Sequence, residues 1–331
     1  MPETTPDAPA DGGEPDCKPR KTLGLALGSG AARGWAHVGV LRALDELGLK
    51  PDVIAGCSVG ALVGGAHLVG ALDDFAAWAR ELKPLSALNA FALKVHSGGF
   101  VDAGPAFDAF AEFDRAIGDL PVTFGAAATD LGIGEEVWVT EGSLLTAVRA
   151  SSAIPVLFHS VRWRDAHGRD RWLVDGALTN PVPVSLARAL GADVVIGVDL
   201  NAVPRVIDRF NSPPPSVPAL VDPPPGPDPG VAGAVAHLID DTRRRVDRQI
   251  QLYRSRADAA PHLFETAYAA ADIFQMHLAR ARAQVTPADI ALAPDMRDAL
   301  PTAFDRADEF VDVGRAALLA RADDLARLLA D

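Results

Sequence analysis

The chain has 331 residues, of which 49% are hydrophobic and 23% are charged, and its formal net charge is −13. This composition is typical of a soluble globular protein with ample apolar material for a large core. The acidic balance argues against a nucleic-acid partner, because phosphate contacts need a basic surface, and against adhesion of the whole surface to anionic lipid. The two cysteines, Cys17 and Cys57, lie in a polar tail and in an apolar stretch, so we expect neither a disulfide framework nor a zinc site.

The amino-terminal residues 1–22 are rich in Pro, Asp and Gly and contain no apolar run. They predict a disordered tail rather than a secretory signal, and therefore a cytoplasmic protein. Residues 53–72 are twenty uncharged residues in a row, which is long enough to span a bilayer. Their glycines instead favour a buried strand, a turn at Cys57 and Ser58, and a helix over residues 59–72, so we predict no transmembrane helix.

The amino-terminal half of the chain alternates strands and helices. The first predicted strand begins at Leu23 and ends in a glycine loop. A helix is predicted over residues 35–47, where four apolar residues share one face and Gly48 follows the last turn. The strand over residues 53–56 and the helix from residue 59 repeat this order, which is typical of a parallel sheet with crossover helices.

Further along, strands are predicted over residues 122–130 and 135–140, a helix over 142–152, a hairpin centred on 167–168, a helix over 182–192 and a strand over 193–200. Residues 203–230 hold ten prolines and predict a long loop, either a mobile flap or a passive linker. Two helices over 231–284, a strand over 289–294 and a helix over 305–330 complete the chain. We expect one α/β domain over residues 23–331, with a helical part at 231–331.

The first motif is GSGAARG, from Gly28 to Gly34, between a strand and a helix. A dinucleotide fingerprint fits poorly, because Arg33 takes the place of its third glycine. A phosphate-binding loop also fails, since no Gly-Lys-Ser/Thr follows. An anion cradle of backbone amides and a simple tight turn both remain open.

The second motif is GCSVG, in which Ser58 is framed by Gly56 and Gly60. After a strand and before a helix, this pattern is typical of a nucleophile elbow, whose strained turn needs small residues on both sides of the nucleophile. A glycine-rich turn between a strand and a helix that has no catalytic role would show the same sequence pattern. Cys57 is a rival nucleophile, but it is off-centre in the motif and is better explained as a buried thiol.

The third motif is DGA, Asp175-Gly176-Ala177, at the end of an apolar strand. It predicts a turn, and it can also present a carboxylate to a cleft. A Ser…Asp…His triad in that chain order would require His237, His262 or His277. All three fall in helical patterns, so no histidine presents itself as the base, whereas a carboxylate can accept a proton directly.

Together the three motifs resemble the patatin-like phospholipase family, above all its compact bacterial members. Four segments carry the resemblance, which covers roughly residues 23–318: GSGAARGWAHVGVL, GCSVGALVGG, ASSAIPVLF and LVDGALTNPVPVSLARALGADVVIGVDL. The resemblance implies a three-layer α/β sandwich with a mostly parallel central sheet flanked by helices. It also implies a lipid acyl hydrolase, of phospholipase, lysophospholipase or esterase type, that needs no metal and no cofactor.

The resemblance further implies roles for individual residues. Ser58 would be the nucleophile and Asp175 its proton acceptor, and Arg33 would help to fix the glycine loop. The remaining residues of the three motifs would serve the oxyanion hole (Gly28, Ser29, Gly30 and Ala31) or support the motifs (Gly34, Gly56, Gly60, Gly176 and Ala177). Ser29 and Ala177 stand where many members of the family have glycine, and both variations are tolerated.

Two alternatives and one additional hypothesis stay open. A triad carboxylesterase on a different fold would make one of the three late histidines indispensable, and a non-catalytic lipid-binding member of the family would keep the fold without turnover. Residues 243–256 carry six arginines and one aspartate, and a basic amphipathic helix there would allow peripheral membrane contact. A helix packed on the core, with its arginines in solvent, explains the same pattern.

Overall fold

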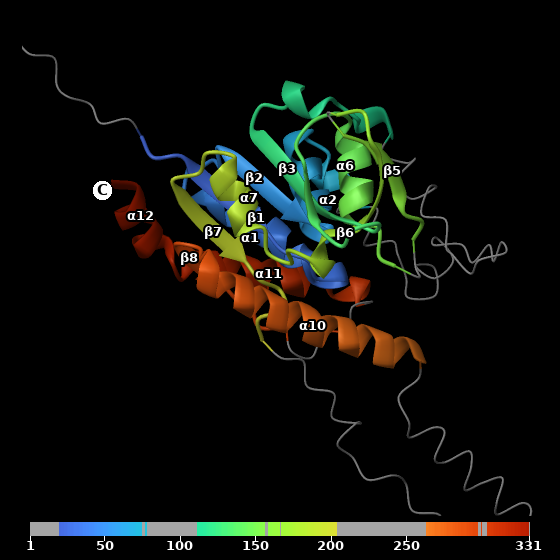
Figure 1. The fold of residues 1–331 in the computed structure, drawn as a ribbon. Coiled ribbons are helices and arrows are strands. Elements are labelled where there is room, and N and C mark those ends of the chain that lie inside the picture. Colours follow the sequence, from blue (N-terminus) through green and yellow to red (C-terminus); the bar gives the residue numbers. More distant parts are fainter. Residues whose placement is uncertain are drawn as a thin grey trace, which may run out of the picture.

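The computed structural model describes residues 20–74, 77, 111–155, 158–165, 167–203, 263–296, 299 and 303–330. Its centre is a mixed, mostly parallel sheet of eight strands in the order β5-β6-β3-β2-β1-β7-β8, with β4 paired to β3 (Figure 1). The strands are β1 (Leu23–Leu27), β2 (Val53–Cys57), β3 (Thr123–Asp130), β4 (Glu136–Val139), β5 (Val161–Arg164), β6 (Asp170–Asp175), β7 (Val194–Val198) and β8 (Ile290–Leu292). The neighbouring strands β3, β2, β1, β7 and β8 pair parallel to one another. The pairs of β3 with β4, β3 with β6 and β5 with β6 are antiparallel.

Helices cover both faces of the sheet. The α-helices are α1 (Trp35–Glu46), α2 (Val59–Leu68), α6 (Leu144–Ser151), α7 (Val184–Ala189), α10 (Leu263–Val285), α11 (Ala307–Leu319) and α12 (Ala322–Ala330). Short 3-10 helices lie at Ala31–Gly34, Ala111–Phe113, Ile117–Asp119, Gly176–Leu178 and Phe304–Arg306. One buried hydrophobic cluster joins one face of β1, β2 and β7 to α1, α2, α6 and α11. A second hydrophobic cluster joins the opposite face of the sheet to α7. The predicted three-layer sandwich is therefore confirmed.

The alternation of side chains along the strands explains the two cores. In β1, Leu23, Leu25 and Leu27 belong to the larger cluster, while Ala26 points to the face under α7. Successive residues of a strand point to opposite faces, so a continuous apolar strand fits only a sheet that is covered twice. Small residues on the α7 side allow that short helix to lie close to the sheet.

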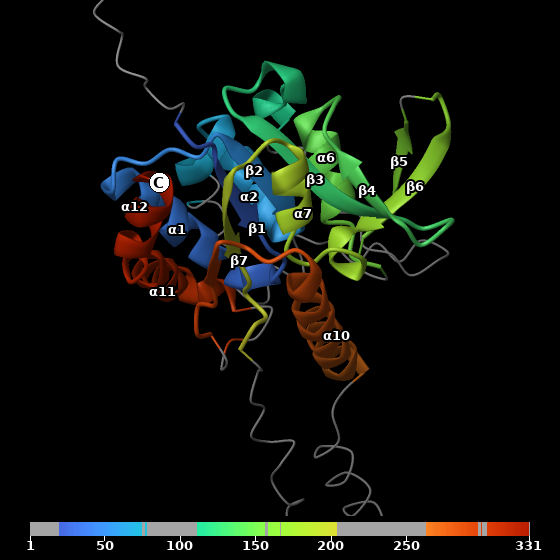
Figure 2. The ribbon, with the colours of Figure 1, turned by 60° about the vertical axis from the view of Figure 1, so that its left-hand side comes forward.

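Most predicted elements are confirmed, with small changes at their ends. The helix expected over residues 59–72 ends earlier, at Leu68, and Gly70 follows it with a φ of 74°. The helix expected over residues 305–330 is divided into α11 and α12. The hairpin centred on residues 167–168 forms from β5 and β6 and projects from the body of the protein (Figure 2).

Several predictions fall outside the described residues. They concern the tail at 1–19, the proline-rich segment from residue 204 and the basic helix at 243–256. The single-domain organisation also stays a prediction. Within the part of the chain that the structure describes, no helix is long and apolar enough to cross a membrane, and residues 53–72 form the predicted strand, turn and helix rather than one long span.

Candidate functional site

Ser58 lies in a strained turn between β2 and α2. Its φ is 55° and its ψ is −122°, a backbone conformation that residues other than glycine rarely adopt. Among the described residues, only Ser58 and Ala31 combine a side chain with a positive φ, and both lie in motifs that the sequence singles out. Backbone strain of this kind concentrates at functional sites, where the surrounding structure holds it in place.

The register of three strands explains how Asp175 reaches Ser58 across 117 residues. The last residue of β2, Cys57, pairs with Ala127, and the last residue of β6, Asp175, pairs with the next residue, Ala128. Strand β4 pairs with β3 at both Ala127 and Ala128 and so occupies one edge of β3 there. Strands β2 and β6 must therefore both lie along the opposite edge of β3, where their C-terminal ends meet. The Oγ of Ser58 donates a hydrogen bond to Oδ2 of Asp175 at 2.7 Å.

The Asp175 carboxyl group is buried, with only 4% of the residue exposed. Its Oδ1 accepts a hydrogen bond of 2.8 Å from the backbone N–H of Ala177. Burial raises the pKa of Asp175 to about 6, and the hydrogen bonds from Ala177 and Ser58 act in the opposite direction. A carboxylate with a pKa near neutrality that contacts a serine hydroxyl is well placed to take its proton.

Three glycines make this close approach sterically feasible. A Cβ at Gly60 would overlap the carbonyl oxygen of Leu27, and one at Gly56 would overlap the backbone of Ala61. A Cβ at Gly176 would overlap the carbonyl oxygen of Ala127. The motif glycines are therefore required by packing at the ends of β1, β2 and β6. Gly34 plays a similar part, since a Cβ there would overlap the side chain of Val59.

The glycine loop divides into two halves. The N–H of Gly28 donates to the carbonyl of Val198 at 3.0 Å, and the N–H of Ser29 donates to that of Pro181 at 2.9 Å. These two amides are engaged within the protein, contrary to the expectation that they would serve an oxyanion. The amides of Gly30 and Ala31 donate to no acceptor in the described part of the chain.

Arg33 and His37 hold the glycine loop from inside. Arg33 is 3% exposed. Its Nε donates to the carbonyl of Gly30 at 3.2 Å, and a terminal nitrogen pairs with Asp272 of α10 at 2.8 Å. Nε2 of His37 lies 2.7 Å from the carbonyl oxygen of Gly28, and burial lowers the pKa of this histidine to about 4. The ring is thus neutral, and it donates from Nε2.

Helix α10 supports the loop from outside. The hydroxyl of Ser29 donates to Oε1 of Gln275 at 2.5 Å, and Nδ2 of Asn201 donates to the carbonyl of Ser29 at 3.1 Å. Nearer the C-terminal end of α10, Arg282 pairs with Glu136 of β4 at 2.6 Å. One helix, far along the chain, therefore contacts both the glycine loop and β4, which pairs with β3 on the edge opposite β6.

No described histidine contacts Ser58 or Asp175. Within the described ranges, the Asp175 carboxyl group accepts hydrogen bonds only from Ser58 and Ala177. His277 is exposed on α10, while His237 and His262 lie outside the described residues. Cys57 is fully buried, and burial raises the pKa of its thiol. A protonated, inaccessible thiol is a poor nucleophile, which agrees with its expected structural role.

The sequence motifs did not identify Ser151, the last residue of α6. Its hydroxyl accepts the N–H of Ser58 at 2.8 Å and donates to the carbonyl of Ala127 at 2.6 Å. Ser151 thereby ties the strained turn to β3. The only signal was its place in ASSAIPVLF, a segment quoted for the resemblance without a role.

Comparison with known proteins finds a matching family model and several relatives of this chain. A family model described as patatin-like phospholipase matches residues 25–188, which include both Ser58 and Asp175. An uncharacterized NTE family protein of Mycobacterium tuberculosis is 41% identical over 181 residues, covering 54% of this chain and 49% of that protein. A lysophospholipase of Emericella nidulans is 30% identical over 190 residues, covering 55% of this chain and 12% of that protein.

The chain thus spans about half the length of the mycobacterial relative that it matches. Among solved structures, VipD from Legionella pneumophila aligns with 92% of this chain and 67% of its own, with a TM-score of 0.46 and 14% identity.

Proposed function

Because this chain belongs to the patatin-like phospholipase family, we propose that it is a serine hydrolase of lipid acyl esters. The observation that carries the proposal is the hydrogen bond of 2.7 Å between Oγ of Ser58, in its strained turn, and the buried carboxylate of Asp175. The substrate is a carboxylic ester of a lipid. A lysophospholipid is the first to test, since one relative is named a lysophospholipase.

In the proposed reaction Asp175 accepts the hydroxyl proton as Oγ of Ser58 attacks the ester carbonyl carbon. The alcohol leaves with a proton returned by Asp175, and the acyl group remains on Ser58. Water then attacks this acyl-enzyme, again with Asp175 as proton acceptor, and Asp175 returns this proton to Oγ of Ser58 as the bond to the acyl group breaks and the fatty acid is released. Such a base must lie within hydrogen-bond reach of the proton that it removes, and the 2.7 Å contact supports that role.

The oxyanion of the tetrahedral intermediate needs donors that are not already engaged. The proposal assigns these to the amides of Gly30 and Ala31, because the amides of Gly28 and Ser29 donate within the protein. The first amides of α2, which begins at Val59, add the positive end of a helix next to Ser58. Arg33 and His37 would act as positioning residues, since both hold carbonyl groups of the glycine loop.

A fluorophosphonate probe provides the direct test of this function. We expect the probe to form a covalent adduct with the wild-type chain and none with Ser58→Ala, because an activated serine hydroxyl attacks phosphorus as it attacks an ester. Mass spectrometry of the digested protein assigns the modified residue. An unlabelled but folded wild-type chain would favour the non-catalytic alternative, and loss of labelling in His237→Ala or His262→Ala would favour the triad.

The pH dependence of activity offers a second prediction. Asp175 must be ionised to accept a proton, and its pKa is raised to about 6. We therefore expect kcat/KM for a water-soluble ester to be constant above this pH and to fall about tenfold per pH unit below it. Circular dichroism at each pH controls for unfolding. A rate that stays constant down to pH 4.5 in a folded protein would exclude Asp175 as the base.

A further inference from the structure

The β5–β6 hairpin and the β3–β4 loop together form an exposed surface that the proposed reaction does not use. The register pairs Arg162 with Trp172 and Arg164 with Asp170, so these four side chains lie on one face of the hairpin. The N–H of Leu131 donates to the carbonyl of Trp172 at 2.8 Å, which places the β3–β4 loop directly beside β6. We call the set Leu131, Ile133, Arg162, Arg164 and Trp172 the hairpin surface.

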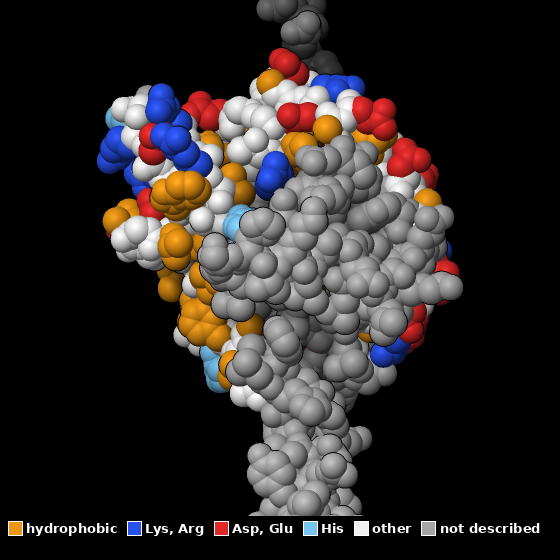
Figure 3. Space-filling model, turned by 90° about the vertical axis from the view of Figure 1, so that its right-hand side faces the viewer, with side chains coloured by type: hydrophobic (Ala, Val, Ile, Leu, Met, Phe, Trp, Pro, Cys, Tyr) orange, Lys and Arg blue, Asp and Glu red, His pale blue; other side chains and the backbone are white. Residues whose placement is uncertain are grey.

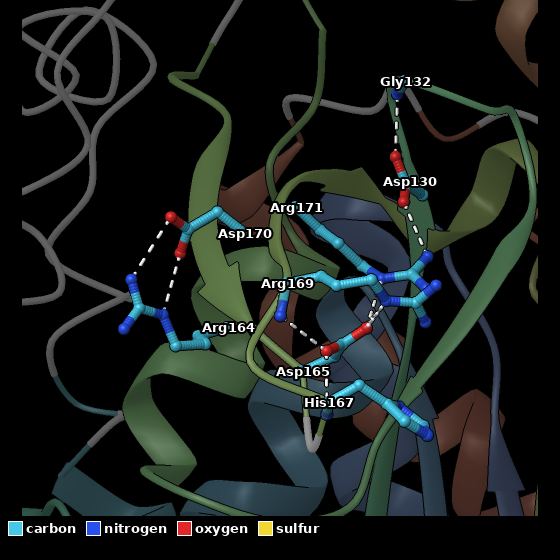
Figure 4. Close-up of polar contacts among 8 residues, drawn as sticks. All are labelled: Asp130, Gly132, Arg164, Asp165, His167, Arg169, Asp170 and Arg171. Atoms are coloured by element: carbon cyan, nitrogen blue, oxygen red, sulfur yellow. Dashed lines mark hydrogen bonds and ion pairs between the residues drawn. The ribbon is translucent and has the colours of Figure 1, made fainter.

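Ion pairs hold the hairpin and the loop as one unit. In Figure 4 the side chains of Arg169 and Arg171 converge on Asp165. Arg171 also pairs with Asp130 at 2.8 Å, and Oδ1 of Asp130 accepts the N–H of Gly132 in the β3–β4 loop. These ion pairs and this hydrogen bond fix the backbone of the loop relative to the hairpin. The loop backbone therefore has little conformational entropy to lose when a partner binds.

The hairpin is basic on an otherwise acidic protein. Residues 161–172 contain four arginines and two aspartates, a local charge of +2 against −13 for the chain, and Asp130 and Glu135, which flank the β3–β4 loop, bring the charge of hairpin and loop together to zero. Asp170 pairs with both Arg162 and Arg164, and these bonds lower its pKa to about 2. Even so, the Arg162 and Arg164 side chains remain 61% and 66% exposed.

Large apolar side chains are exposed next to these arginines. Trp172 is 53% exposed, Leu131 59% and Ile133 60%. Figure 3 shows Lys and Arg side chains gathered at one projecting corner of the protein, with hydrophobic side chains beside them. A cluster of Trp, Leu and Ile with flanking Arg suits the boundary between lipid headgroups and acyl chains, where the indole and the apolar side chains insert and the guanidinium groups meet phosphates.

We propose that the hairpin surface binds the face of an anionic lipid bilayer. The biological purpose of this binding rests on the proposed function, because the lipid ester to be cleaved would lie in such a bilayer. Trp172 and Asp175 belong to the same strand and are three residues apart, about 10 Å at the rise of a β-strand. Docking through Trp172 would therefore hold Asp175 and Ser58 close to the lipid headgroups.

Vesicle co-sedimentation of the full chain tests the proposal, with phosphatidylcholine vesicles prepared with and without phosphatidylglycerol. The Ser58→Ala variant is used, so that binding is measured without turnover. We expect binding to the anionic vesicles that weakens with added salt. Arg162→Glu combined with Arg164→Glu should weaken it more than about tenfold, as should Trp172→Ala combined with Ile133→Ser.

Trp138→Ala is the matched control, because Trp138 is 41% exposed but its indole contacts Glu136 rather than the hairpin. This variant should bind as the parent does. Equal binding by parent and hairpin variants would overturn the proposal and point to another segment, such as residues 243–256. No binding by the parent chain would also overturn it.

Two further readouts keep this test apart from the proposed function. Turnover of a water-soluble ester by the hairpin variants, on the Ser58 background, should equal that of wild type, which also shows that they fold. If probe labelling and ester turnover both fail, but the hairpin variants lose vesicle binding, the membrane-binding proposal is supported and the proposed hydrolase function is not. If the hairpin variants instead lose binding to an acidic protein and not to vesicles, the partner is a protein.

Discussion

Ester turnover is expected to fall about 10⁴-fold or more in Ser58→Ala, and about 10²–10⁴-fold in Asp175→Asn. Alanine removes the attacking oxygen altogether. Asparagine keeps the shape of the carboxyl group and an acceptor for the Ala177 amide, but it cannot take the proton of Ser58. Steady-state kinetics with a water-soluble ester and with a lysophospholipid measure both effects. Wild-type activity in either variant would contradict the assignment of these two residues.

Cys57→Ala provides the matched control for this pair. Cys57 is adjacent to Ser58 in the chain and fully buried, so its replacement tests the effect of disturbing the turn without removing either reactive group. We expect its kcat/KM to stay within about tenfold of wild type, since a small-to-smaller change in a core costs modest stability. A loss as large as that of Ser58→Ala, together with labelling of Cys57 by the fluorophosphonate probe, would make the thiol the nucleophile.

Gly60→Ala is expected to cause a large loss of stability, and to abolish activity with it. An added Cβ would overlap the carbonyl oxygen of Leu27, which belongs to the central strand β1 and cannot move without disturbing the sheet. Inserting a methyl group into a packed core costs about 1–3 kcal/mol, and more where backbone is in the way. We therefore expect the free energy of unfolding to fall by about 3 kcal/mol or more, measured by urea denaturation.

Gly118→Ala is the control for this prediction. An added Cβ at Gly118 would meet no atom within 4 Å, and this glycine does not have a positive φ. The substitution should leave both stability and activity close to wild type. If Gly60→Ala is as stable and as active as Gly118→Ala, the packing of α2 on β1 does not constrain the turn at Ser58.

Much of the fold could be predicted because its signals are local. The strand and helix at residues 23–48 follow from an apolar run, a helical stripe and Gly48, whose φ of 69° matches a residue after a helix end. The elbow was predictable for the same reason, since Gly56, Ser58 and Gly60 act within five residues. Helix ends were less certain, and α2 ends at Leu68 where a longer helix was expected.

The site itself was only partly predictable. The motifs named Ser58 and Asp175 as candidates, but a motif does not place two residues in contact. Their contact depends on β2 and β6 meeting end to end along one edge of β3. Ser151 could not be found at all, because its hydroxyl matters only once α6 lies against the turn.

The sequence by itself determined which segments are strands, which turns are strained and where the candidate nucleophile stands, since these depend on neighbours within a few residues. Only the tertiary structure decided which donors and acceptors are already engaged. It paired the amides of Gly28 and Ser29 with distant carbonyl groups and left those of Gly30 and Ala31 without acceptors in the described part of the chain. Burial, which comes from the whole sheet and its two helical layers, also set the raised pKa of Asp175. These are long-range effects, and no local pattern of residues contains them.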